Sequence, residues 1–253
     1  MAFDSRPRQI AHWAAFLLLC AGCVAGLFWL TLPSAEPLRN GNPTTTALIE
    51  ARMREARKQG RPGRRNQLWV PLGRISYWLI RAVVNSEDAR FFEHDGIDEK
   101  QTKIALTSAL EEGHLGRGAS TITQQLAKNL WLGEERTLWR KLREAILARR
   151  LETLGKNRIL ELYLNVAEWG DGIYGADAAA RVWFGKPAAE LQPEEAAVLA
   201  AMLPAPRKRS PTNPSPQLRK RARQILRLYA MYGDLSGEEL AEARWRLDGI
   251  VGM

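Results

Sequence analysis

Cysteine is nearly absent from this chain of 253 residues. Its two cysteines, Cys20 and Cys23, both lie in an apolar N-terminal run, so the rest of the chain has none and disulfide bonds do not contribute to its stability. Histidine is almost as rare. With no cysteine partner, His12, His94 and His114 argue against a His/Cys metal site. Internal repeats are also absent.

Negative charge is in short supply as well. The chain has 37 Lys and Arg against 28 Asp and Glu, which gives a net charge of +9 and a pI near 9.9. This excess indicates an anionic partner, and nucleic acid, acidic lipid and phosphorylated substrate all qualify on charge alone. The composition, 45% apolar and 26% charged, is that of a folded protein. Without its membrane segment and linker the chain keeps about 185 residues, enough for one domain with a hydrophobic core.

One long apolar run is present, and it lies near the N-terminus. Trp13 to Leu32 contains no charged residue, and its length matches the hydrocarbon core of a bilayer. Arg6 and Arg8 precede the run and only Arg39 follows closely, which predicts a cytoplasmic N-terminus. We therefore expect a cytoplasmic tail over 1-12 and a transmembrane anchor over 13-32.

Two other interpretations of this run are weaker. A cleaved signal peptide would have a shorter apolar core, and Pro33-Ser34-Ala35 is a poor cleavage site. Lipid modification of Cys23 is disfavoured because Cys20 stands where an aliphatic residue is expected. After the anchor, 33-66 is expected to form a linker and a short basic helix capped by Thr46. The main domain is expected over 67-253.

Nearly every stretch beyond Trp69 predicts helix, because apolar residues recur at helical spacing between glycine breaks. No run alternates convincingly, apart from the β-prone Leu68–Val70, and WGDGIYG is expected to be a tight loop. The fold class is therefore all-α, or strongly α-dominated. The expected helices are 75–89, 98–111, 120–131, 137–153, 156–165, 174–183, 193–203 and 217–232, and a last one that opens at Ser236 with the capping box SGEE.

The stretch NSEDARFFEHDG places an acidic pair at the end of an apolar helical pattern. Continuing by fours from Ile75 through Leu79 and Val83 lands on Glu87, so this carboxylate follows a face that is expected to be buried. Desolvation disfavours the charged form of a carboxyl group, which makes a glutamate a useful proton acceptor near neutrality. The stretch alone leaves two interpretations open: a catalytic carboxylate, or a residue that ends its helix near the surface.

Two further stretches combine polar and cationic side chains on one face. In GRGASTITQQLAKNLWL, Thr121, Gln125 and Lys128 lie apart from the apolar row and could bind an oxygen-rich ligand, or form a solvated face. In ERTLWRKLREAILARRLE, Arg140 and Glu144 are spaced to form a surface ion pair. The alternative to this surface pair is a cationic wall that binds phosphate and surrounds one carboxylate. The side of this helix that packs on the core is expected to be the stripe of Leu138, Leu142, Ala145 and Ile146.

The C-terminal helical stretch 217–232 is expected to pack on the core and to carry a basic outer face. Its apolar positions recur at helical spacing on one side. The other side collects five cations, namely Arg219, Lys220, Arg221, Arg223 and Arg227.

Together these segments resemble the peptidoglycan glycosyltransferase family, whose fold is lysozyme-like. EDARFFEHDGID is similar to its first motif, GASTITQQLAKNLWL to the second, RKLRE to the third, KNRILELYLN to the fourth and AAVLAAMLPAP to the fifth. Order and spacing agree over roughly residues 46–227. An anchor followed by a single domain resembles the monofunctional members of the family.

The resemblance implies a role for individual residues. Glu87 matches the catalytic glutamate regarded as the base, and Glu144 matches the second essential glutamate. Asp88 and His94 match positions that we regard as mainly structural, and Ala119 departs from a common glycine. The residues that match the donor site around its pyrophosphate are Ser120, Gln125, Lys128, Arg136 and Lys141.

The resemblance also implies a substrate and a location. The enzyme would polymerise lipid II into β-1,4 glycan strands at the bacterial inner membrane, with a periplasmic catalytic domain. Its partners would be lipid II, the growing glycan chain, the membrane and other cell-wall synthesis or division proteins, and not nucleic acid. A divalent cation, Mg²⁺ or Mn²⁺, could assist at the pyrophosphate, although no dedicated ligand set is visible. The alternatives are a lytic transglycosylase or muramidase, and an inactive cell-wall-binding module.

Overall fold

The computed structural model describes residues 6–112, 120–133 and 137–252. The chain divides into two compact units, Met1–Ser34 and Ala35–Met253. The first contains α1 (Arg6–Thr31), which is the one helix among the described residues that is long and apolar enough to cross a membrane. Its apolar side chains are exposed, for example Leu18 at 74% and Leu30 at 79%. Such exposure suits a lipid-facing helix.

The second unit is built almost entirely of helices, which confirms the expected α-dominated fold class. The expected helices are present, with ends within two residues of the expected positions. The helices are α2 (Ala47–Lys58), α3 (Tyr77–Glu87), α4 (Glu99–Glu112), α5 (Ile122–Ala127), α6 (Leu138–Leu151), α7 (Lys156–Val166), α8 (Ala176–Phe184), α9 (Pro193–Met202), α10 (Pro216–Met231) and α11 (Gly237–Val251). A π-helical turn, Lys128–Leu132, continues α5.

Polar caps explain where several helices begin. The Thr46 hydroxyl accepts a hydrogen bond from the Ile49 amide at 3.2 Å and starts α2. Capping boxes start α5 at Thr121 and α11 at Ser236. Each cap satisfies amide groups that the first helical turn leaves without a partner.

A small three-stranded sheet, with the order β1-β3-β2, was not expected. β1 (Asn66–Gln67) runs parallel to β3 (Ile173–Tyr174), and β2 (Glu168–Gly170) runs antiparallel to β3. The expected loop WGDGIYG is therefore mostly a β-hairpin, and the β-prone stretch proposed at Leu68–Val70 is not a strand. Strands of two or three residues are too short to show an alternating pattern.

The segment before β1 belongs to the second unit. Leu48 and Ile49 of α2 are buried against Tyr174 of β3. The guanidinium of Arg158 in α7 donates to the carbonyl oxygens of Leu38, at 2.8 Å, and Gly41, at 2.6 Å. Residues 35–66, expected to form a linker and a short helix, are thus held against the rest of the unit.

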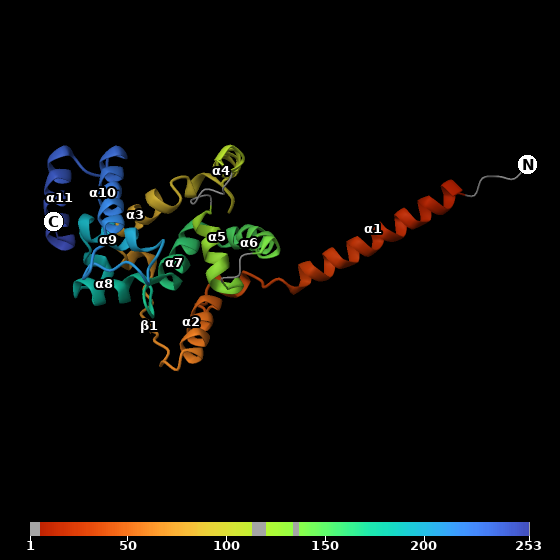
Figure 1. Ribbon diagram of the computed structural model, residues 1–253, viewed down its shortest axis with the longest axis horizontal. Coiled ribbons are helices and arrows are strands. Elements are labelled where there is room, and N and C mark those ends of the chain that lie inside the picture. The colour runs from red at the N-terminus through yellow and green to blue at the C-terminus, as the bar shows by residue number, and fades with distance from the viewer. Residues whose placement is uncertain (1–5, 113–119, 134–136, 253) are drawn as a thin grey trace, which may run out of the picture. The chain divides into compact units, whose positions relative to one another are not determined.

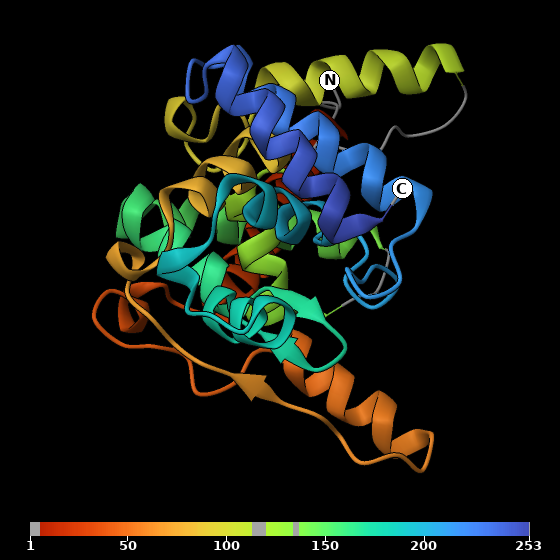
Figure 2. The same cartoon turned by 90° about the vertical axis from the view of Figure 1, so that its left-hand side faces the viewer.

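The helices of the second unit pack in two groups. α10 packs against α3, α9 and α11, while α5 packs against α6 and α7 (Figure 1). Figure 2 shows the same unit from the side, with α10 and α11 in blue next to each other. The fully buried aromatic side chains lie in this core, among them Tyr163, Trp169 and Tyr229.

The expected packed stripe of α6 is wrong. Leu138 is 92% exposed and Leu142 is 47% exposed, whereas Leu147, Ala148 and Leu151 are fully buried. The helix has apolar residues on more than one face, and helical spacing alone does not tell which face meets a neighbour. Ala145 and Ile146 of the expected stripe are only half-buried.

Candidate active site

Glu87, the last residue of α3, is held by donors from two other helices. Its side chain is 12% exposed, and it follows the buried Leu79 and Val83 as the helical phase predicts. The Gln125 side-chain nitrogen Nε2 donates to Oε2 of Glu87 at 3.0 Å, and Nη2 of Arg221 donates to Oε1 at 2.5 Å. A carboxylate has two oxygens with several acceptor positions, so each keeps room for a further donor.

The orientation of the Gln125 amide is set by Tyr163 in α7. The Tyr163 hydroxyl donates to Oε1 of Gln125 at 2.9 Å, which leaves the Nε2 end to face Glu87. Burial raises the pKa of Tyr163 well above 10, and the negative charge of Glu87 adds to this effect. The phenol therefore remains a hydrogen-bond donor at any physiological pH.

Glu144 lies at the centre of a second group of charges. Its side chain is 4% exposed, and it accepts hydrogen bonds from Nη1 of Arg140 and Nζ of Lys141, both at 2.5 Å. The expected Arg140–Glu144 pair is present, but its carboxylate is buried and is shared with Lys141. The structure thus has a buried carboxylate between two cations, and the binding of phosphate by these cations stays a prediction.

Ser120 connects the two groups. Its hydroxyl oxygen accepts a hydrogen bond from Nζ of Lys141 at 2.9 Å, and its carbonyl oxygen lies 3.5 Å from Nε2 of Gln125. A continuous chain of polar contacts therefore runs from Glu87 through Gln125, Ser120 and Lys141 to Glu144. The structure brings these five expected site residues together.

Lys128 and Arg136 are the two remaining expected site residues. Lys128 begins the π-helical turn after α5, and its backbone nitrogen donates to the carbonyl oxygen of Gln125, so it lies one helical turn beyond that residue. Arg136 lies outside the described residues.

Comparison with known proteins identifies the family of this chain. A model of the transglycosylase family matches residues 54–230. The chain belongs to the transglycosylase family. Proteins named biosynthetic peptidoglycan transglycosylase are similar over most of their length. That of Nitrosomonas eutropha is 43% identical over 224 residues, 87% of this chain and 91% of the relative. That of Rhodospirillum centenum is 47% identical over 226 residues, 89% of this chain and 92% of the relative.

Membership of the transglycosylase family confirms the resemblance drawn from the five motifs. It also confirms the lysozyme-like fold class and the expectation of a glycosyltransferase. All five motifs fall within the matched range, including the residues of the polar chain around Ser120.

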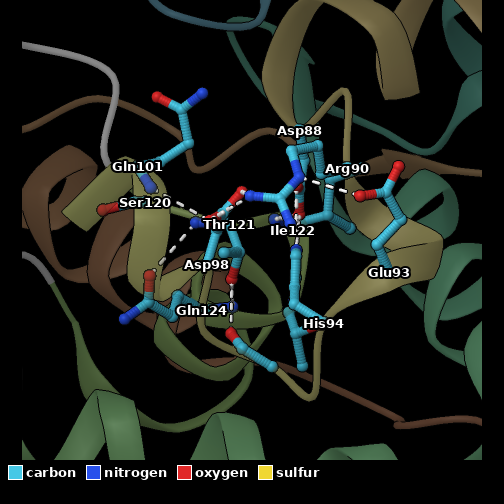
Figure 3. Close-up of polar contacts among 12 residues, drawn as sticks. Asp88, Arg90, Glu93, His94, Asp98, Gln101, Ser120, Thr121, Ile122 and Gln124 are labelled. Atoms are coloured by element: carbon cyan, nitrogen blue, oxygen red, sulfur yellow. Dashed lines mark hydrogen bonds and ion pairs between the residues drawn. The ribbon is translucent and has the colours of Figure 1, made fainter. Parts of the chain in front are cut away.

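In this transglycosylase Asp88 ties the first motif to the start of α5. Its Oδ2 accepts a hydrogen bond from the Ile122 amide at 3.0 Å, and its Oδ1 lies 2.9 Å from Nε2 of His94. The Thr121 hydroxyl donates to the Gly96 carbonyl at 2.6 Å. Figure 3 shows these side chains between the two segments. Because Ser120 directly precedes this cap, the same contacts fix its position at the start of α5.

The same network orders the beginning of α4. Asp98 accepts a hydrogen bond from the Gln101 amide at 3.0 Å and caps the helix, and Nη1 of Arg90 donates to it at 3.0 Å (Figure 3). Arg90 also pairs with Glu93 at 2.9 Å. These contacts give Asp88 and Asp98 a structural role.

A metal ion does not fit the acidic cluster of the first motif. Ligand atoms of Asp88, His94 and Asp98 lie within 4.8 Å of one another. However, Asp88 and Asp98 are already bound by backbone amides, and Arg90 donates to Asp98. A cation there would have to displace a guanidinium of the same charge sign. We therefore derive no step through a metal at this cluster.

Arg221 is the site residue that the sequence did not single out. It lies on α10, 134 residues from its partner Glu87. Burial lowers the pKa of the Arg209 guanidinium, the positive charge of Arg221 lowers it further, and the negative charge of Glu87 acts in the opposite direction. The Arg209 guanidinium donates to the Ala201 carbonyl at 2.6 Å. An arginine of the basic segment PRKRSP is thus held within electrostatic reach of Arg221 and Glu87.

Proposed function

We propose that this chain polymerises lipid II into β-1,4 glycan strands of peptidoglycan and releases polyprenyl pyrophosphate. The observation that carries the proposal is the chain of contacts from Glu87 through Gln125, Ser120 and Lys141 to Glu144. It couples a carboxylate that can accept a proton to a cation that can bind phosphate. The names of the relatives support peptidoglycan as the product.

In the reaction the 4-hydroxyl oxygen of the acceptor sugar attacks the anomeric carbon of the donor. The hydroxyl proton passes to the Glu87 carboxylate. The bond between the anomeric carbon and the phosphate oxygen breaks, and its electron pair leaves with the pyrophosphate. Attack from the face opposite the leaving group inverts the α-linked phosphate to a β-glycoside.

Gln125 and Arg221 have a positioning role in this scheme. Each binds one oxygen of Glu87, which fixes the rotation of the carboxylate and the direction of its remaining lone pairs. A base in a fixed orientation does not need to reorganise when the acceptor hydroxyl arrives.

The negative charge of the leaving pyrophosphate needs to be neutralised, whereas its protonation matters less, because pyrophosphate is already a good leaving group. Lys141 is the natural donor, since its ammonium group is anchored between Glu144 and Ser120. Lys128 and Arg136 would add charge from the second motif and from the segment before α6. Cations held in place before the reaction stabilise the developing charge without reorganisation.

The location follows from α1. We propose that α1 anchors the chain in the bacterial inner membrane with the N-terminus in the cytoplasm and the catalytic unit in the periplasm. Arg6 and Arg8 before the apolar run favour this orientation. An anchored enzyme meets lipid-linked donor and acceptor at the surface where both reside. Other cell-wall synthesis or division proteins would meet it at the same surface.

The test is incubation of the purified full chain with labelled lipid II, followed by separation of the products by length. Our proposal predicts glycan polymer together with free polyprenyl pyrophosphate. Release of fragments from finished cell wall, without polymer, would instead identify a lytic enzyme. Binding without either product would identify an inactive module.

A further inference from the structure

A second cationic site lies apart from the polar chain around Glu87. A cavity of about 170 Å³ opens between the end of α2, the loop after it, the turn of the β-hairpin and the segment after α9. In Figures 1 and 2, α2 and its loop, drawn in orange, lie at the opposite end of the unit from α4. None of the residues that line this cavity belongs to the polar chain from Glu87 to Glu144.

Arginine dominates the lining. Four guanidinium groups face two carboxylates, which leaves a formal charge of +2, and the charged residues are Arg52, Arg61, Arg64 and Arg207 against Glu55 and Asp171. Four arginines from three separate chain segments converge on this one small cavity. Such a concentration of like charge is unfavourable unless a negative charge compensates it.

Three carboxylates compensate the inner pair, Arg52 and Arg207. Glu55 and Asp171 belong to the lining, and Glu168 lies outside it, so the formal charge of the whole group including Glu168 is +1. Arg207 binds Glu55 through two hydrogen bonds of 2.8 and 3.2 Å. Arg52 donates to the buried Glu168 at 2.9 Å and lies 3.5 Å from Glu55. These contacts hold two guanidinium groups in fixed positions along the wall of the cavity.

The outer pair, Arg61 and Arg64, forms no direct ion pair with a carboxylate among the described residues. Within the same ranges, the Arg61 guanidinium donates a hydrogen bond to the side-chain oxygen of Gln59, and its charge reaches Glu55 only at longer range. The Arg64 side chain forms no hydrogen bond or ion pair within the part of the chain that the structure describes. These two groups keep donors available for a ligand.

The backbone around this pair is ordered. Gly60, with φ +65, ends α2, and the Arg61 amide donates to the Ala56 carbonyl at 2.9 Å, which is the contact pattern of a glycine-terminated helix. Gly172, with φ +74, approaches Arg64 so closely that an added Cβ would lie 2.5 Å from the Cβ of Arg64. Local structure thus fixes the backbone from which the Arg61 and Arg64 side chains extend.

We propose that this cavity binds a phosphate group. Guanidinium groups match phosphate oxygens with paired hydrogen bonds, and a tetrahedral oxyanion can accept from several of them at once. Pockets for whole drug-sized ligands measure about 300–1,000 Å³, so the smaller volume here suits a free phosphate or the phosphate end of a lipid headgroup. The site is independent of the glycan chemistry at Glu87.

The test is isothermal titration of the full chain in detergent with inorganic phosphate at constant ionic strength. The Arg61→Gln/Arg64→Gln double variant should lose this binding, with affinity at least about tenfold weaker, because two charged donors are removed. Arg54→Gln, on an exposed position of α2 outside the cavity, is the matched control and should titrate like the wild type. Both outer arginines are exposed, and thermal melting checks that the double variant is folded.

Phosphate could also enter the pyrophosphate region of the active site, so the Lys141→Gln variant is titrated as well. It should keep the binding that the double variant loses, and the double variant should keep its polymerisation rate. Unchanged phosphate affinity in the double variant, or no phosphate binding by the wild type, would overturn the proposal. The titration does not require polymerisation, so it fails or succeeds separately from the proposed function.

A second set of titrations identifies the source of the phosphate. Tighter binding of sn-glycerol 3-phosphate than of inorganic phosphate would support a lipid headgroup, and the reverse order would support free phosphate. Acetate bound as tightly as phosphate would contradict the assignment, because the site would then accept any small oxyanion.

Discussion

The hydroxyl of Tyr163 donates a hydrogen bond of 2.9 Å to the side-chain oxygen of Gln125. This contact decides which end of the Gln125 amide faces Glu87, because the oxygen is occupied and only the nitrogen is left to donate. A fully buried aromatic side chain of the core therefore controls the proposed base through one intermediate residue.

Tyr163→Phe should reduce kcat about tenfold, because the loss of one hydrogen bond lets the Gln125 amide rotate. The ring stays, so KM and the melting temperature should change little. Steady-state polymerisation rates measure the effect. A kcat equal to that of the wild type would mean that the orientation of Gln125 does not depend on Tyr163.

Arg221→Gln should reduce kcat about 10- to 100-fold, the range expected for a lost hydrogen bond to a charged group. Arg221→Lys should recover part of the activity, because one ammonium group can replace the single contact to Oε1 of Glu87. Arg227→Gln, an exposed change on the same helix, is the control and should leave kcat unaffected. If both Arg221 variants kept full activity, the positioning role would be wrong.

Asp88→Asn should lower the melting temperature by about 5–10 °C, because it weakens a buried acceptor that serves both the Ile122 amide and His94. Asp95→Asn, an exposed change in the same motif, serves as the control. Thermal unfolding followed by circular dichroism measures both variants. Equal melting temperatures would show that Asp88 does not hold the start of α5.

Glu194 predicts a pH dependence of stability. Burial raises the pKa of its carboxyl above the ordinary 4.5, and Arg246, at 3.8 Å, only partly opposes this. Its stabilising contribution is therefore fully present below pH 4.5 and is lost as the pH rises through the raised pKa. The melting temperature of Glu194→Gln, relative to that of the wild type, should therefore rise with pH. The increase in this difference should be at least about 2 °C between pH 4.5 and pH 8. A constant difference between pH 4.5 and pH 8 would contradict this cause.

The sequence predicted the helices well because local rules decide them. Thr46 and Ser236 carry their caps in the sequence itself, and the helical phase that placed Glu87 after a buried face is visible within three turns. The motif resemblance assigned Glu87, Gln125 and Glu144 to one site, and their side chains lie along one chain of polar contacts.

What the sequence did not predict depends on distant contacts. Arg221 stands among five cations on one helix, and only its approach to Glu87 distinguishes it. Leu138 and Leu142 have the spacing of a packed stripe, but α6 meets its neighbours with later residues such as Leu147. In both examples, contacts between residues far apart in the sequence determine the result, and a local pattern does not show such contacts.

The central claim is that Glu87 accepts the proton of the acceptor hydroxyl. Its most direct test is the polymerisation of lipid II by Glu87→Gln beside the wild type, with matched melting temperatures. The amide keeps the shape of the side chain but cannot act as a base, so we predict a rate at least about 100-fold lower with little change in lipid II binding. Polymerisation by Glu87→Gln at the rate of the wild type would contradict the mechanism.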